Sequence, residues 1–290
     1  MKTVKFLLLF VACIPFIGMA QVLDPGQENP LDGVYSKSID TPHKHPIPYV
    51  KMREADIMWL QRVWRVVDMK EKVNHSFYFP INPTQGRKNF MQVVMDGIAL
   101  ERIHAYAAVD SSLDGTQDFD DTFKLQLTAS EASGALSFDE TINGTDEYGE
   151  DSVYVDKSEI TLDEITQFKI KEEVFFDKQR SLMETRILGI APLIPDKNGE
   201  EGSVKAAFWI YFPEARFVFA EAEVYNRHND ADRMTYEELF WKRKFSSRVV
   251  KVSNVYDRSI DQYKGPLDAL LEAERLEEEI FNREHDIWSF

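Results

Sequence analysis

An acidic run at residues 110–121, DSSLDGTQDFDD, is the stretch best suited to binding a metal ion. An EF-hand calcium loop places its ligands at positions 1, 3, 5, 9 and 12, with a glycine at position 6, and Gly115 falls at that sixth position. Such loops usually end in glutamate between two helices, whereas a strand is expected before this run and no helix after it. We therefore expect a solvated acidic loop, with calcium binding as the alternative. The calcium ligands would be Asp110, Ser112, Asp114, Asp118 and Asp121.

Histidines offer little further metal chemistry. His43 and His45 would supply two imidazole nitrogens, but no third ligand can be identified near them in the sequence. His285, between two acidic residues, lies where a helix is expected to end, and a histidine there favourably meets the helix dipole. We expect all three histidines to be ordinary surface residues.

The sequence lacks the familiar catalytic motifs. It has no G-x-S-x-G elbow, H-E-x-x-H pair, Walker loop or G-x-G-x-x-G turn. Its one cysteine, Cys13, lies in the expected signal peptide, so the exported chain would have no disulfide or thiolate. We expect that the protein is not an enzyme and that it binds no cofactor. A periplasmic hydrolase that uses two of the many carboxylates is the alternative.

The first 20 residues are typical of a signal peptide. Lys2 and Lys5 precede an apolar run at residues 6–17, and small residues follow up to Ala20. A lipoprotein attached through Cys13 is the alternative. Removal of residues 1–20 takes away two lysines and no acid, so the net charge changes from −16 to −18. We expect a periplasmic protein that binds neither nucleic acid nor anionic lipid and has no membrane span.

Residues 21–50 predict an extended, proline-rich arm. Its five prolines prevent a helix, but a flexible linker would not carry so many apolar residues. We expect the arm to lie on a surface, either of its own domain or of another subunit. The apolar residues that would make this contact are Leu31, Val34, Tyr35, Ile39, Ile47 and Tyr49.

Residues 53–72 predict a helix. At about 100° per residue, its apolar side chains cover about half of the circumference, which is wider than the stripe of an ordinary surface helix. We expect this helix to be covered on more than one side, by its own domain or by a partner. Trp59 and Trp64 would be its anchors.

The remaining chain predicts an α+β domain at 51–290, with an acidic loop region at about 110–164. A helix should follow Asn89, another should follow Thr235, and a C-terminal helix should begin at Pro266. This last helix should dock through an apolar face made of Leu267, Leu270, Leu271, Leu276, Ile280 and Phe281. Short connections favour a mixed, mostly antiparallel sheet packed with helices. Its strands are expected at residues 103–109, 123–127, 168–176, 186–193, 206–212, 216–225 and 248–256.

Several segments together resemble the GldN (PorN) family of the type IX secretion and gliding machinery of Bacteroidetes-type bacteria. The resemblance covers nearly all of the chain after the signal peptide and is weakest at residues 111–164. Its segments include DGVY at 32–35, READIMW at 53–59, FFDKQRS at 175–181, ILGIAPL at 187–193, LFWKR at 239–243 and SNVYDR at 253–258.

The resemblance implies a non-enzymatic periplasmic subunit. Members of the family associate with the outer-membrane lipoprotein GldK (PorK) in rings, which are needed to export proteins with C-terminal sorting domains. Contact with the periplasmic part of GldM (PorM) and self-association in the ring are also implied. A calcium-dependent binding module and the hydrolase remain the alternative functions.

Overall fold

A long central strand, β1 (Ile57–Asp68), occupies the segment for which the sequence predicts a helix, so that prediction is wrong. β1 pairs antiparallel with β8 (Gln167–Asp177) on one side and with β12 (Arg248–Val252) on the other. Both faces are also covered in the middle of the strand, because Val63 and Trp64 point in opposite directions and are both buried. A strand buried on both faces is a continuous apolar run, which periodicity alone does not distinguish from a helix.

The computed structural model describes residues 44–84, 86–111, 117–119, 121–145, 151–195, 204–227, 229 and 231–287. All of them belong to one compact unit, which spans Thr41–Phe290. The predicted signal peptide and most of the predicted arm lie outside the described residues.

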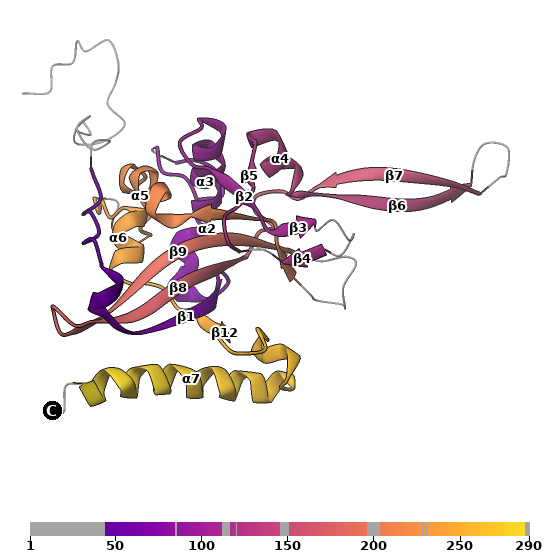
Figure 1. Cartoon of the computed structure of the whole chain (residues 1–290). Coiled ribbons are helices and arrows are strands. Elements are labelled where there is room, and N and C mark those ends of the chain that lie inside the picture. The colour runs from indigo at the N-terminus through magenta and orange to yellow at the C-terminus, as the bar shows by residue number, and fades with distance from the viewer. Residues whose placement is uncertain are drawn as a thin grey trace, which may run out of the picture. The chain divides into compact units, whose positions relative to one another are not determined.

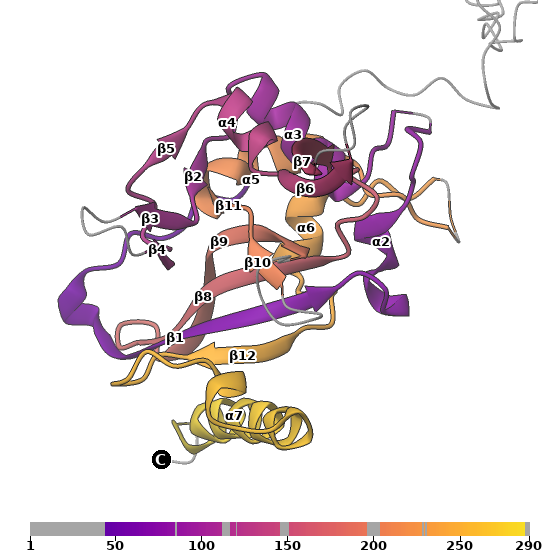
Figure 2. The same ribbon diagram turned by 90° about the vertical axis from the view of Figure 1, so that its right-hand side faces the viewer.

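The main sheet has eight strands in the order β12-β1-β8-β9-β11-β2-β5, with β10 paired to β9, and every pairing is antiparallel (Figures 1 and 2). Two separate hairpins, β3-β4 and β6-β7, lie within the predicted acidic loop region. The predicted α+β fold with a mostly antiparallel sheet is therefore confirmed. The other strands are β2 (Ala105–Ala107), β3 (Val109–Ser111), β4 (Gln117–Phe119), β5 (Gln126–Leu127), β6 (Ser137–Thr145), β7 (Asp151–Glu159), β9 (Leu182–Pro195), β10 (Val204–Ala206) and β11 (Phe208–Tyr211).

Side-chain caps begin several of the helices. Asn89 forms a reciprocal capping box with Gln92, and Thr235 accepts a hydrogen bond from the backbone of Glu238. These caps confirm two of the predicted helix starts. The helices are α2 (His75–Tyr78), α3 (Phe90–Ala99), α4 (Ala129–Gly134), α5 (Phe212–Glu221), α6 (Tyr236–Trp241) and α7 (Pro266–Ile287), with short 3-10 turns at Glu54–Asp56, Lys72–Asn74 and Ile260–Gln262.

Two strand predictions are wrong. Residues 216–225 were expected to form a strand, but α5 takes up most of this segment and begins with Pro213 in its first turn, where a missing N–H costs nothing. Residues 123–127 contribute only the two residues of β5, because Phe123 has a φ of 57° and cannot continue a strand.

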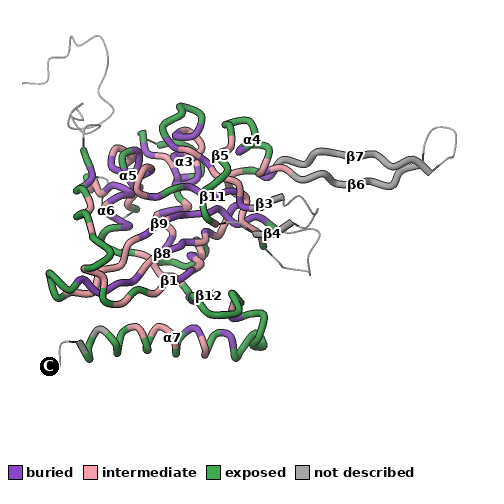
Figure 3. The backbone as a smooth tube through the Cα atoms, in the orientation of Figure 1, coloured by how far each residue is buried: buried purple, intermediate pink, exposed green. Residues whose placement is uncertain are grey.

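The main core lies between one face of the sheet and helices α2, α3, α5 and α6. Aromatic rings fill it: Phe90 contacts Phe168 of β8, Phe219 of α5 and Phe240 of α6, with ring centroids 4.9–5.4 Å apart. The fully buried Tyr236 donates its hydroxyl hydrogen bond to the Lys88 carbonyl oxygen at 2.9 Å. Figure 3 shows the buried residues gathered on the central strands and on the sides of the helices that face them.

The opposite face of the sheet carries a smaller cluster around Trp64, Ala191 and Trp209. Phe123 packs onto this cluster at Gly189. A Cβ at Gly189 would lie 2.5 Å from the Phe123 ring, so only glycine leaves room for the ring. The sheet is therefore covered on both faces.

Helix α7 crosses the sheet near β12 and β1 (Figure 2). Between α7 and the main core, one buried carboxylate joins four elements. Glu172 of β8 accepts hydrogen bonds from Arg65 Nε of β1 at 2.5 Å and from Arg243 Nη1, just after α6, at 2.9 Å. Arg65 also pairs with Glu277 of α7.

This cluster predicts a large stability difference between two adjacent glutamates. Glu172→Gln should lower the free energy of unfolding by about 3–5 kcal/mol, because Glu172 is completely buried and its change leaves the largely buried Arg65 without this counter-charge. Glu173→Gln is the matched control: its pair with Arg62 is partly exposed, so the loss should be about 0–1 kcal/mol. Urea unfolding measures both values, and equal losses would contradict this role of Glu172.

Candidate functional site

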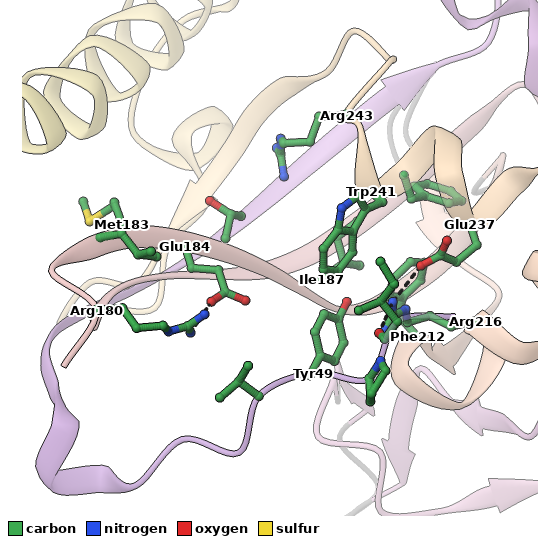
Figure 4. A pocket seen from close by; sticks show the side chains of 16 residues that line it. Tyr49, Arg180, Met183, Glu184, Ile187, Phe212, Arg216, Glu237, Trp241 and Arg243 are labelled. Carbon is green, nitrogen blue, oxygen red and sulfur yellow. Dashed lines mark hydrogen bonds and ion pairs between the residues drawn. The ribbon is translucent and has the colours of Figure 1, made fainter. Parts of the chain in front are cut away.

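A pocket of about 610 Å³ opens where residues 47–50 cross the domain. Its walls come from this segment, from the start of β9 and from helices α5 and α6 (Figure 4). Three arginines line it: Arg180, Arg216 and Arg243. In a chain with a net charge of −16, this is a local concentration of positive charge.

Tyr49 holds the segment on the domain. Its ring lies 4.1 Å from the guanidinium carbon of Arg216 and 5.0 Å from that of Arg186, and it stacks on Trp241 with ring centroids 6.1 Å apart. Burial raises the pKa of the Tyr49 hydroxyl, against the opposing effect of Arg216. The end of the predicted arm therefore lies on its own domain, which was one of the two alternatives.

Arg216 joins the segment to helix α6. Its Nη2 atom donates to Glu237 Oε1 at 2.6 Å and to the carbonyl oxygen of Ile47 at 2.8 Å. Both charged side chains are almost completely buried. A buried ion pair of this kind is costly to break from one side, so it fixes the position of the backbone that it binds.

The remaining carboxylate in the pocket is also paired. Glu184 accepts hydrogen bonds from Arg180 Nη2 at 2.7 Å and from Arg186 Nε at 2.8 Å. A hydrolase of the kind considered would need two converging carboxylates of unequal pKa. Here Glu184 and Glu237 are each bound to arginine, so the pocket gives that hypothesis no support.

The predicted calcium ligands are divided between several structures. Asp110 and Asp118 are backbone partners in the β3-β4 hairpin, while Ser112 and Asp114 lie outside the described residues. Asp121 accepts a hydrogen bond from Trp64 Nε1 at 2.7 Å and pairs with Lys171 at 3.1 Å. Within the described ranges, no three His, Cys, Asp or Glu side chains are placed to hold a metal ion. Calcium binding stays a prediction.

Lys171 explains why Asp121 is turned inward. Its side chain is buried, and burial lowers the pKa of its ammonium group, against the opposing effect of Asp121. The ammonium group also donates to the Asp121 carbonyl oxygen at 2.7 Å. Asp121 thus serves a buried cation and a tryptophan, which gives it a structural role.

The predicted interface residues have different surroundings. Trp64 is buried in the sheet, and Trp59 packs on the cluster beneath α7 with Arg283 over its ring at 4.9 Å. Ile47 is 65% exposed beside the buried anchor Tyr49. A role of these side chains in binding a partner stays a prediction. The other predicted interface residues, Leu31, Val34, Tyr35 and Ile39, lie outside the described residues.

Of the residues that line the pocket, only Ile47 and Tyr49 were predicted as functional from the sequence, and Arg216 and Trp241 are two important ones that were not. Arg216 was placed in a strand, although Pro213 three residues earlier is a signal for the first turn of a helix. Nothing in the sequence indicates that Trp241 stacks on Tyr49, which lies almost 200 positions earlier.

Helix α7 has a second apolar face, and the prediction for its docking is partly wrong. Leu276 and Ile280 pack against the sheet as expected, together with the small residues Ala269 and Ala273, which let the helix approach closely. The other expected docking residues point away from the sheet and are 47–72% exposed. They are Leu267, Leu270, Leu271 and Phe281.

No helix in the described ranges combines the length and the apolar character needed to cross a bilayer. The described residues thus define an α+β protein with an ion-paired pocket and an exposed apolar helix face. The family of the gliding motility associated protein GldN matches residues 52–289. The chain belongs to the GldN family, whose members are gliding motility associated proteins and which is not a known enzyme family. A comparison with curated proteins gave no match.

The anchor at Tyr49 leads to a prediction about the segment at residues 44–50. Tyr49→Ala should speed amide hydrogen exchange there roughly tenfold, because two cation–π contacts of about 0.5–1 kcal/mol each are lost. Tyr49→Phe keeps the ring and should change little. Ile47→Ala is a further control at an exposed neighbour. Equal exchange in all variants would contradict the anchor.

A second prediction concerns pH. The hydrogen bond from Lys242 lowers the pKa of Glu238, and Lys44 adds to this effect. The resulting stabilisation is complete above the ordinary glutamate pKa of about 4.3 and is lost as the pH falls through the lowered value. Carboxyl NMR titration should show Glu238 below 4.3. Lys242→Met should raise this pKa more than Lys44→Met does; the reverse order would be inconsistent with the geometry.

Proposed function

We propose that this protein is a non-enzymatic structural subunit of the gliding and type IX secretion machinery. The observation that carries the proposal is the family match over residues 52–289. The signal peptide predicted from residues 1–20 supports a periplasmic location.

The proposed partners are an outer-membrane lipoprotein of the GldK type, further copies of the same chain in a ring, and the periplasmic part of GldM. These partners follow from the family resemblance. The exposed apolar face of α7 supports binding to other proteins, because contiguous apolar surface is commonly an interaction site. In this assembly the subunit would help to export proteins with C-terminal sorting domains.

The chemistry of the pocket supports a non-enzymatic role. Both of its carboxylates are bound to arginine side chains, and Arg243 at its edge is held by the buried Glu172. The charged groups of the pocket therefore hold the fold and the arm segment together. An acid–base pair would require at least one of them to be released.

Purification of the tagged full-length chain from its native cell envelope tests the proposal. We expect the lipoprotein and untagged copies of the chain to co-purify with it, and deletion of the gene should stop both gliding and secretion. A chain that purifies alone from cells that still glide and secrete would refute the proposal.

The predicted arm contacts can be tested in the same cells. Alanine at Leu31, Val34, Tyr35 and Ile39 together should abolish recovery of the lipoprotein, because these residues are the apolar anchors of the arm. The unfolding midpoint should not change. Alanine at Ser36, Lys37 and Ser38 is the matched control and should leave recovery intact. Full recovery with the first variant would show that the arm is not the contact.

A further inference from the structure

Helix α7 carries an exposed stripe that is both apolar and acidic. Leu267, Leu271, Glu274, Glu278 and Phe281 follow one another at spacings of three and four residues and so share one side of the helix. All five side chains are exposed. Glu274 and Glu278 form no ion pair within the described part of the chain. The α7 stripe, defined by these residues and Leu270, is therefore an amphipathic face that no other described residue of the chain covers.

A second surface has complementary properties. A groove of about 610 Å³ lies between the 3-10 turn at Lys72–Asn74, helix α2, the segment at residues 224–227 and helix α6. Val73, Phe79 and Leu239 give it an apolar lining. Lys72, His75, Arg227 and Lys244 also line it, and no Asp or Glu among the described residues does. Lys72 and Lys244 are exposed and have no ion pair among the described residues.

We propose that the α7 stripe of one copy of the chain docks into this groove of a second copy. An amphipathic helix in an apolar groove is a common recognition mode, and its anchors repeat at i, i+3, i+4 and i+7. Leu267, Leu270 and Leu271 match this spacing and would enter the groove, while Glu274 and Glu278 would pair with Lys72 and Lys244.

Charge decides between the possible modes of self-association. Helix α7 contains eight acidic residues and two arginines, so two such helices packed against each other would repel. The groove presents cations and no carboxylate, which favours α7 as its occupant. A contact between two different surfaces is also consistent with the strongly negative chain, because it places opposite charges together.

The contact is of the head-to-tail type. The α7 stripe and the groove lie on different parts of the domain, since α2 and α7 are well separated in both views (Figures 1 and 2). A contact between two different surfaces repeats from copy to copy and closes into a ring or continues as a filament. The inference rests on the proposed function, because it supplies the contact by which copies of the subunit assemble.

Charge exchange tests the contact with the full chain in sedimentation velocity experiments. Glu274→Lys with Glu278→Lys should weaken self-association at least tenfold, and so should Lys72→Glu with Lys244→Glu. The chain that carries all four changes should regain most of the lost association, because the charges are opposite again. Glu54→Lys with Glu164→Lys makes the same change of net charge as the double variant of Glu274 and Glu278, but at exposed sites elsewhere, and should not change self-association.

The outcomes separate this inference from the proposed function. If neither double variant weakens association, or if the four-fold variant stays weak while its unfolding midpoint is normal, the contact between the α7 stripe and the groove is refuted. The same holds if the wild-type chain remains monomeric. In each case, recovery of the lipoprotein from the cell envelope would leave the proposed function standing, whereas its loss in the wild type would refute that function.

Discussion

The buried carboxylate of Glu172 is the constraint on which the arrangement of this domain depends. Val63 and Val67 of β1 point to the same face of the sheet, but one belongs to the cluster beneath α7 and the other to the main core. Arg65 lies between them, and Glu172 binds it. A buried charge is tolerated only when it is paired and hydrogen-bonded, so each element that contributes to the cluster is held in register. Because Glu277 must reach Arg65, the rotation of α7 about its axis is also fixed. The exposed apolar face of α7 follows from this rotation.

The sequence was sufficient to predict the helices and strands that have local signals, such as caps and alternation, and insufficient to predict those that lack them. The cap residue Asn89, the capping-box spacing at Thr235 and the alternation along residues 168–176 correctly predicted two helices and β8. The same reasoning failed for β1, because a central strand covered on both faces loses its alternation and its apolar residues spread over a wide helical arc. The β-branched and aromatic residues of β1 were the available signal, since they favour strands. Rotation of α7 could not be predicted either, since Arg65 is more than 200 residues away in sequence.

The candidate site was predictable only in outline. An arm anchored by apolar residues was expected, and Tyr49 is such an anchor, but its partners Arg216 and Trp241 come from helices distant in sequence. Contacts of this range leave no periodic pattern, so a single sequence does not predict them. The two tryptophans, by contrast, were predicted from the sequence as anchors of an interface. Trp59 and Trp64 are large enough to anchor an interface, yet a strand sends them to opposite faces of the sheet, where each packs against its own chain.

The proposed assembly would use two different contacts. The predicted arm, anchored at residues 44–50, would bind the lipoprotein, and the exposed side of α7 would bind another copy of the chain. Arg216 and Tyr49 fix the backbone beside α5 and α6, so the arm leaves the domain from a defined point. The 23 residues at 21–43 span at most about 80 Å when fully extended, which is enough to reach a neighbouring protein without moving the domain. The α7 stripe has no such reach and requires direct contact between rigid surfaces. In the proposed assembly, the helix would fix the spacing of the copies and the predicted arm would bind the lipoprotein. Mutations in the two regions should therefore separate assembly of the copies from attachment to the lipoprotein.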